Sequence, residues 1–122
     1  MGPMPEPPHR QPRMHNVLPN SRSFTYHLSR RAKKAGVDIR TGVSVTQLLE
    51  KDSKVIGVEA KSADGILNVH ARNGVVLAAG DFTNDPTLKA RFMGSQEAKV
   101  EGVNQSATGD GQRMAETLGA TI

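Results

Sequence analysis

A chain of 122 residues with 36% hydrophobic and 3% aromatic residues can form one small domain with a thin, aliphatic core. The absence of cysteine excludes disulfides, thiolate metal sites and cysteine nucleophiles, and it fits the cytoplasm, where we expect the protein to lie. The formal net charge of +4 raises the question of nucleic-acid binding, whose answer depends on where the basic residues lie.

Residues 1–20 are expected to be an extended or disordered leader. Five of the seven prolines lie in residues 1–13, which show no hydrophobic period. The leader also lacks the apolar stretch of a secretory signal, and no later apolar run is long enough to span a membrane. The sequence therefore predicts a soluble chain whose folded part covers residues 21–122.

A basic amphipathic helix is predicted over residues 21–35. Its apolar side chains recur near a period of 3.6 residues, and they are Phe24, Leu28, Ala32 and Ala35. Asn20 or Ser21 can cap its start and Gly36 can end it. Eight of the 16 basic residues lie in residues 1–40, so the positive excess belongs to the leader and one helix face. Because aromatic stacking partners are lacking, a solvated surface is favoured over a nucleic-acid interface.

Four segments after this helix are predicted to be strands. They are residues 37–40, 43–50, 54–61 and 66–72. Gly65 and Gly74, each after an Asp or Asn, supply the positive φ that tight turns need. The run "VVLAA" at residues 75–79 does not alternate, which is typical of a short strand buried on both faces in a parallel sheet. A meander followed by such a strand predicts a mixed sheet and an α/β fold.

The last third of the chain is predicted to hold two short helices. The first covers Pro86–Met93 with Asp85 as its cap, and residues 94–107 are expected to be irregular. The second begins in the loop "TGDG" and ends at Gly119. Its apolar side chains lie close on one side, and they are Met114, Ala115 and Leu118.

Two short segments, "LAAGDF" and "TGDG", carry the chemical signals. A glycine at the carboxyl end of a buried strand lets a ligand approach the backbone, although Gly80 can equally serve only to reverse the chain. At the start of a helix the N–H groups point outward, so Asp110 can bind a ligand hydroxyl or cap the helix. On chemistry alone the cap is favoured. Neither GxGxxG nor GxxxxGK[ST] is present.

The histidines do not predict a catalytic or metal site. His9, His15, His27 and His70 show no metal-ligand spacing and have no partner carboxylate in register. Tyr26 is explained as packing at the flank of the first helix. The sequence therefore assigns no catalytic residue and no metal ligand.

The order of the segments resembles the flavoprotein subunits of the fumarate reductase and succinate dehydrogenase family, a group that includes ketosteroid dehydrogenases and aspartate oxidase. The matching segments are "HLSRRAKKAGVDIRTGVSVTQLLEKDSKVIGVEA", "NGVVLAAGDFTNDPTLKARF" and "TGDGQRMAETLGA", within about residues 22–122. This resemblance implies a partial FAD-binding Rossmann-like domain over residues 21–122, with FAD as cofactor and a small-molecule substrate in the parent enzyme.

The resemblance also implies cofactor contacts. The strand matching "GVSV" lies along the adenine in such proteins, which implicates Val43 and, through its backbone, Val45. The segment matching "LAAG" passes the dinucleotide, and its residues are Ala78, Ala79 and Gly80. The loop that approaches the flavin consists of Thr108, Gly109, Asp110 and Gly111. Asp110 thus becomes a ligand contact, alone or in addition to capping.

The chain departs from the family pattern in several places. Many relatives have Thr and a second Gly where this chain has Ala79 and Asp81, so a hydroxyl contact is lost. The N-terminal βαβ unit with its glycine-rich loop and the usual catalytic His and Arg have no counterpart. We therefore expect an internal fragment of an FAD-dependent oxidoreductase, inactive by itself, that moves a hydride at a carbon–carbon bond beside a carbonyl or carboxylate.

The alternative function is a non-catalytic binding module. In one version the chain associates with itself or with a complementary chain, because "VVLAA" needs neighbouring strands. In the other version the basic surface binds nucleic acid in a salt-dependent way.

Overall fold

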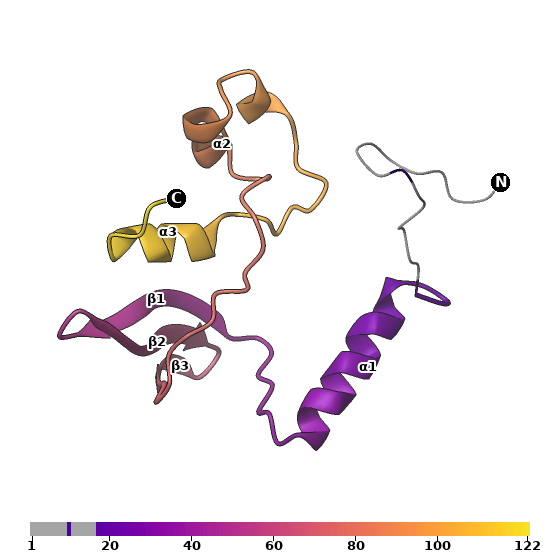
Figure 1. Ribbon diagram of the computed structural model, residues 1–122, viewed down its shortest axis with the longest axis vertical. Coiled ribbons are helices and arrows are strands. Elements are labelled where there is room, and N and C mark those ends of the chain that lie inside the picture. The colour runs from indigo at the N-terminus through magenta and orange to yellow at the C-terminus, as the bar shows by residue number, and fades with distance from the viewer. Residues whose placement is uncertain (1–9, 11–16) are drawn as a thin grey trace. The chain divides into compact units, whose positions relative to one another are not determined.

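The computed structural model describes residue 10 and residues 17–122, so most of the leader predicted over residues 1–20 lies outside the described residues. The chain divides into two compact units, Met1–Thr41 and Gly42–Ile122, and each is described by itself (Figure 1). Within the described part of the chain, no helix has the length and apolar character needed to cross a membrane.

The first unit contains helix α1, Ser21–Lys34, which confirms the helix predicted there. The side chain of Asn20 accepts a hydrogen bond from the backbone N–H of Arg22 at 3.0 Å, as a helix cap does. Gly36 has a φ of +84°, and the N–H of the next residue, Val37, donates to the carbonyl of Ala32 at 3.0 Å. The predicted cap and the predicted glycine stop are therefore both confirmed.

The strand predicted at residues 37–40 is wrong. The segment has no strand structure, and Val37 and Ile39 are 52% and 41% exposed. Asp38 and Arg40 form an ion pair with each other at 2.7 Å instead. Alternation of apolar and polar residues does not make a strand without a second strand to bond to, and the described residues of this unit contain no strand.

The second unit contains an antiparallel sheet of three strands in the order β1-β2-β3 (Figure 1). Its strands are β1 Ser44–Lys51, β2 Lys54–Ser62 and β3 Gly65–His70. The β1–β2 turn places Asp52 and Ser53 at φ values of 53° and 58°, and Gly65 at the second turn has a φ of +119°. Left-handed turn residues match the twist of two adjoining strands, so the predicted meander is confirmed.

Gly57 allows β2 and β3 to approach closely. It is buried and pairs with His70, and a Cβ at this position would lie 2.1 Å from the carbonyl oxygen of Val69. Any side chain here would therefore push the two strands apart.

The buried strand predicted at residues 75–79 is also wrong in its burial and pairing. The segment forms no ladder with β1, β2 or β3, and Val76 is 90% exposed. The described sheet ends with β3 at His70, and none of its strands bonds to residues 75–79. The predicted mixed sheet is therefore wrong as well, since both strand pairs of the described sheet are antiparallel. The fold still combines helices with a sheet, as the α/β prediction requires.

Three helical segments complete the second unit: α2 Pro86–Phe92, the single 3₁₀ turn η1 Glu97–Lys99 and α3 Asp110–Thr117. Both α-helices were predicted, and Asp85 caps α2 by accepting from the N–H of Leu88 at 2.8 Å. Gly119 has a φ of +86° after the end of α3, as expected for a helix stop.

The core of the described chain is small. Its buried hydrophobic residues are Ala60, Leu88 and Ala107, and no large side chain is fully buried among the described residues. Several large apolar side chains are exposed, including Val76, Val100 and Val103. Much of the apolar surface is therefore left open to contact with another molecule or chain.

Candidate functional site

The end of the "LAAG" segment and the start of α3 lie against each other. The N–H of Gly109 donates to the carbonyl of Asp81 at 3.1 Å, and the side-chain amide of Gln112 donates to the carbonyl of Gly80 at 3.0 Å. A Cβ at Gly111 would lie 3.4 Å from the Cβ of Ala79. We call this region, residues 77–81 and 108–112, the glycine crossing. It joins the two segments that carried the chemical signals in the sequence.

The glycines of the crossing serve different purposes. Gly109 is buried with a φ of +73°, and a Cβ there would lie 2.3 Å from a methyl carbon of Leu88. Packing therefore requires glycine at this position. Gly80 also has a positive φ, +86°, but a Cβ there would have no atom of this chain within 4 Å. The backbone of Gly80 is thus open for a ligand to approach.

The start of α3 presents free backbone donors. Gly109 occupies the cap position and has no side chain to cap the helix, so the interpretation of Asp110 as the cap is wrong. The N–H of Arg113 is the one that bonds back to Gly109, at 3.0 Å, which leaves the N–H groups of the first three helical residues without carbonyl partners inside the helix. Asp110 is the first of these residues, and it is exposed.

Two ion pairs hold α2 against α3 beside the crossing. Arg113 pairs with Asp85, the cap of α2, and Arg91 pairs with Glu116 at 2.6 Å. Asp85 is only 8% exposed. The hydrogen bond from Arg113 holds the pKa of the Asp85 carboxyl below its ordinary value, and the N–H of Leu88 adds to this effect. Arg91 likewise lowers the pKa of Glu116.

Asp81 contributes a fixed negative charge next to Gly80. Its carboxylate accepts hydrogen bonds from the N–H of Thr83 at 2.9 Å and from the Thr83 hydroxyl at 2.7 Å. These two bonds, the backbone one first, lower the pKa of Asp81. The side chain is exposed, so the charge is presented at the surface of the crossing.

Asn84 organises the loop that leads into α3, and the sequence interpretation missed it. Its side-chain amide donates to the carbonyl of Gln105 at 3.0 Å, and its side-chain oxygen accepts from the N–H of Gly102 at 3.1 Å. Its own backbone N–H donates to Ala107 at 2.9 Å. An Asn in a turn before a helix cap was the available signal, because its amide can satisfy two backbone groups together.

The two predicted adenine contacts lie at the beginning of the sheet. Val43 directly precedes β1, and Val45 is 39% exposed and pairs with Ala60 of β2. Because β1 is an edge strand in the described sheet, one side of its backbone is free to bond to a ligand. The hydrogen bonds and glycine contacts that define the crossing do not include Val43 or Val45 among the described residues.

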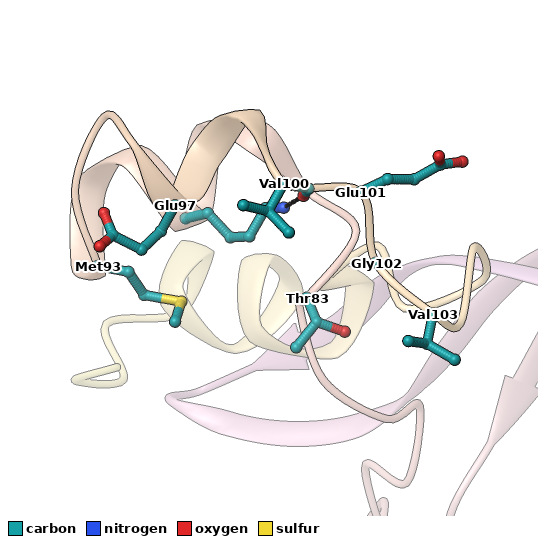
Figure 2. Close-up of a pocket in the computed structure, with 8 residues that line it drawn as sticks. Thr83, Met93, Glu97, Val100, Glu101, Gly102 and Val103 are labelled. Atoms are coloured by element: carbon teal, nitrogen blue, oxygen red, sulfur yellow. Dashed lines mark hydrogen bonds between the residues drawn. The ribbon is translucent and has the colours of Figure 1, made fainter.

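A separate hollow of about 440 Å³ lies between α2, η1 and the following loop (Figure 2). Met93, Glu97 and Val100 lie around it, as Figure 2 shows. Lys89 also lines it, is 5% exposed, and donates from its ammonium group to the carbonyl of Val100. Lys89 thus links α2 to the loop, and no pattern in the sequence indicated this hollow.

A family model described as "FAD binding domain" matches residues 5–122. Over 97 residues the chain is 34% identical to 3-oxosteroid 1-dehydrogenase of Mycobacterium tuberculosis strain H37Rv. The matched region covers 74% of this chain and 17% of that protein. Over 109 residues it is 28% identical to NADH:acrylate oxidoreductase of Vibrio harveyi, and this match covers 85% of this chain and 11% of that protein. The chain thus spans less than a fifth of these curated relatives.

Solved structures show the same likeness. An open conformation of a flavocytochrome c3 fumarate reductase superposes with a TM-score of 0.75 at 28% identity, covering 89% of this chain and 20% of that one. A 3-ketosteroid Δ4-(5α)-dehydrogenase of Rhodococcus jostii RHA1, in complex with 4-androstene-3,17-dione, gives a TM-score of 0.69 at 29% identity. The superposition covers 77% of this chain and 20% of that chain. The resemblance seen in the sequence is therefore confirmed.

Proposed function

The chain belongs to the FAD binding domain family, and from this membership we propose that it forms part of an oxidoreductase that transfers a hydride at a carbon–carbon bond beside a carbonyl or carboxylate. Its cofactor is FAD, and its similarity to fumarate reductase and steroid dehydrogenase structures places it among FAD-dependent oxidoreductases. The names of the relatives support the type of bond, because fumarate and acrylate carry a carboxylate and 3-oxosteroids carry a ketone.

The glycine crossing is the observation that carries the proposal, and its residues fit FAD. The open backbone at Gly80 gives the dinucleotide room to pass closely along Ala78 and Ala79, which are also exposed. The free N–H groups at the start of α3 suit phosphate oxygens or electronegative atoms of the flavin ring. When bound, FAD supplies the group that accepts or donates the hydride.

Two polar side chains of the loop are available for hydrogen bonds to the cofactor. Thr108 and Asp110 are exposed on either side of the buried Gly109. A hydroxyl of the cofactor can donate to the carboxylate of Asp110, and the hydroxyl of Thr108 can donate or accept. At the sheet, the free edge of β1 gives Val43 and Val45 backbone groups for the adenine. The nine residues assigned from the resemblance thus stay in the proposal, with buried Gly109 positioning Thr108 and Asp110 rather than offering its own N–H, which bonds to Asp81.

FMN, which carries only the flavin half of FAD, and ADP, which carries the adenine half, test these assignments separately. We expect Asp110→Asn to weaken FMN binding roughly 10- to 150-fold, since a hydrogen bond to a charged group contributes roughly 1.5–3 kcal/mol. ADP binding is expected to stay unchanged. Asp64→Asn is the matched control, because Asp64 is also an exposed aspartate and lies in the β2–β3 turn. Equal FMN affinities for the two variants would contradict the role of Asp110.

We further propose that the 122-residue chain does not turn over substrate by itself. None of its residues is assigned a catalytic role, and it matches only 11–17% of the lengths of the two curated relatives. The check is an assay of the purified chain with added FAD, an artificial electron acceptor or donor, and either 4-androstene-3,17-dione or fumarate. Oxidation or reduction of either compound by the chain alone would contradict this proposal.

A further inference from the structure

The loop between η1 and α3 has no regular structure of its own. Residues 100–109, here called the α3 loop, form neither helix nor strand. Asn104 shapes one turn inside it, since its carbonyl accepts from the N–H of Ala107 at 3.0 Å and its side chain accepts from the N–H of Ser106 at 3.1 Å. Such local bonds do not fix where the loop lies in the unit. Bonds to neighbouring segments must do so.

Three bonds of this kind come from Asn84, in the segment before α2. Its side-chain amide donates to the carbonyl of Gln105, its side-chain oxygen accepts from the N–H of Gly102, and its backbone N–H donates to the carbonyl of Ala107. Ala107 is buried and directly precedes Thr108, where the second segment of the glycine crossing begins. One residue therefore holds the α3 loop up to the first of the proposed cofactor contacts.

The side chain at position 84 must be short and must both donate and accept. A Cβ at Gly102 would lie 2.8 Å from the carbonyl oxygen of Thr83 and 2.9 Å from the Cβ of Asn84, so the loop backbone lies directly against this segment. An amide bonds to a carbonyl and to an N–H together, whereas a carboxylate only accepts and a methyl group does neither. A backbone group that loses its partner weakens the conformation in which it was paired. The position of the loop therefore depends on asparagine.

On the basis of the function proposed above, we propose that Asn84 is a positioning residue for FAD, which acts by holding the α3 loop and does not itself touch the cofactor. Two backbone bonds join the same stretches of chain, one from Asn84 to Ala107 at 2.9 Å and one from Gly109 to the carbonyl of Asp81 at 3.1 Å. Loss of the Asn84 side-chain bonds lets the loop shift at Thr108, which lies between these two bonds. Hydrogen bonds weaken steeply away from good geometry, so a shifted loop binds the flavin less tightly.

The test uses the full 122-residue chain and three variants. Asn84→Ala removes both side-chain bonds, and Asn84→Asp keeps the size of the side chain and its acceptor but loses the donor to Gln105. Asn73→Ala is the matched control, because Asn73 is an exposed asparagine in the bend after β3. Amide hydrogen exchange of the ligand-free chain reports whether the loop is held. Titrations with FMN and with ADP separate the flavin end of the site from the adenine end.

We expect both Asn84 variants to speed exchange of the Gly109 amide about tenfold and to weaken FMN binding about tenfold. Exchange in β2 and ADP affinity are expected to stay unchanged, and Asn73→Ala should match the unmodified chain. Loss of ADP binding and of β2 protection in both Asn84 variants would overturn the proposal, because the role would then be purely structural. Unchanged Gly109 exchange, or faster exchange with unchanged FMN affinity, would overturn it as well. An unmodified chain that binds no FMN contradicts the proposed function instead, and the Gly109 exchange rates then still decide whether Asn84 holds the loop.

Discussion

Adding one methyl group at Gly80 separates the cost of a backbone conformation from the cost of blocking a cofactor. Gly80 and Gly119 both have a φ of +86°, and a Cβ at either position would have no atom of this chain within 4 Å. Alanine at either site therefore pays the same penalty for a left-handed backbone, about 1–2 kcal/mol. We expect Gly80→Ala and Gly119→Ala to lower the free energy of unfolding by similar amounts.

The two variants should differ in FAD affinity. If the dinucleotide passes the open backbone of Gly80, the added methyl group overlaps it, and overlap in a packed site costs about 1–3 kcal/mol. This corresponds to a loss of affinity of roughly five- to 150-fold in Gly80→Ala, whereas Gly119→Ala should bind as the unmodified chain does. The assay combines chemical denaturation with FAD titration of each variant. Equal FAD affinity for the two variants would refute the placement of the cofactor at Gly80.

Three further predictions concern stability. Because Arg113 lowers the pKa of Asp85, their pairing stabilises the fold above about pH 4, and this stabilisation is lost as the pH falls through the lowered pKa. The free energy of unfolding, measured as a function of pH, should show this loss in acid. In Asp85→Asn the loss between about pH 4 and lower pH should be smaller. Ser53→Gly should raise the free energy of unfolding by about 0.5–1 kcal/mol, because Ser53 has a φ of 58° in a turn that favours glycine, and unchanged or lower stability would count against that turn geometry. Gly57→Ala should destabilise the sheet by at least about 2 kcal/mol because its Cβ would overlap the carbonyl of Val69, and a denaturation midpoint equal to that of the unmodified chain would contradict this packing.

Local signals in the sequence were sufficient for the helices and turns. Asn20 and Asp85 cap the helices that were predicted to follow them, and Gly36 and Gly119 end theirs. These predictions succeed because a cap or a left-handed stop depends on a few neighbouring atoms. The meander was predictable for a related reason, since Gly65 and the segment around Ser53 provide tight turns between alternating strands.

Strand pairing was not predictable from local pattern. Residues 37–40 alternate and residues 75–79 are apolar, yet neither segment is part of the described sheet. A strand needs a partner that can be distant in the chain, and composition does not reveal whether one is available.

The candidate site was predictable only in its separate parts. The segments around Gly80 and Asp110 were identified because glycines next to a strand end and a helix start are recognisable signals. Their contact depends on Gln112 reaching the carbonyl of Gly80, and the loop between them depends on Asn84. Such side-chain bonds between residues about 20 to 30 positions apart leave no periodic pattern in the sequence.

Titration of the purified chain with FAD, monitored by flavin fluorescence and absorbance, measures directly whether the glycine crossing binds the cofactor. Circular dichroism first establishes that the chain is folded. We expect saturable binding with one FAD per chain, because the glycine crossing presents an open backbone at Gly80 and free donors at the start of α3. A folded chain that leaves the flavin spectrum unchanged up to millimolar FAD would contradict the claim that the crossing is a cofactor surface.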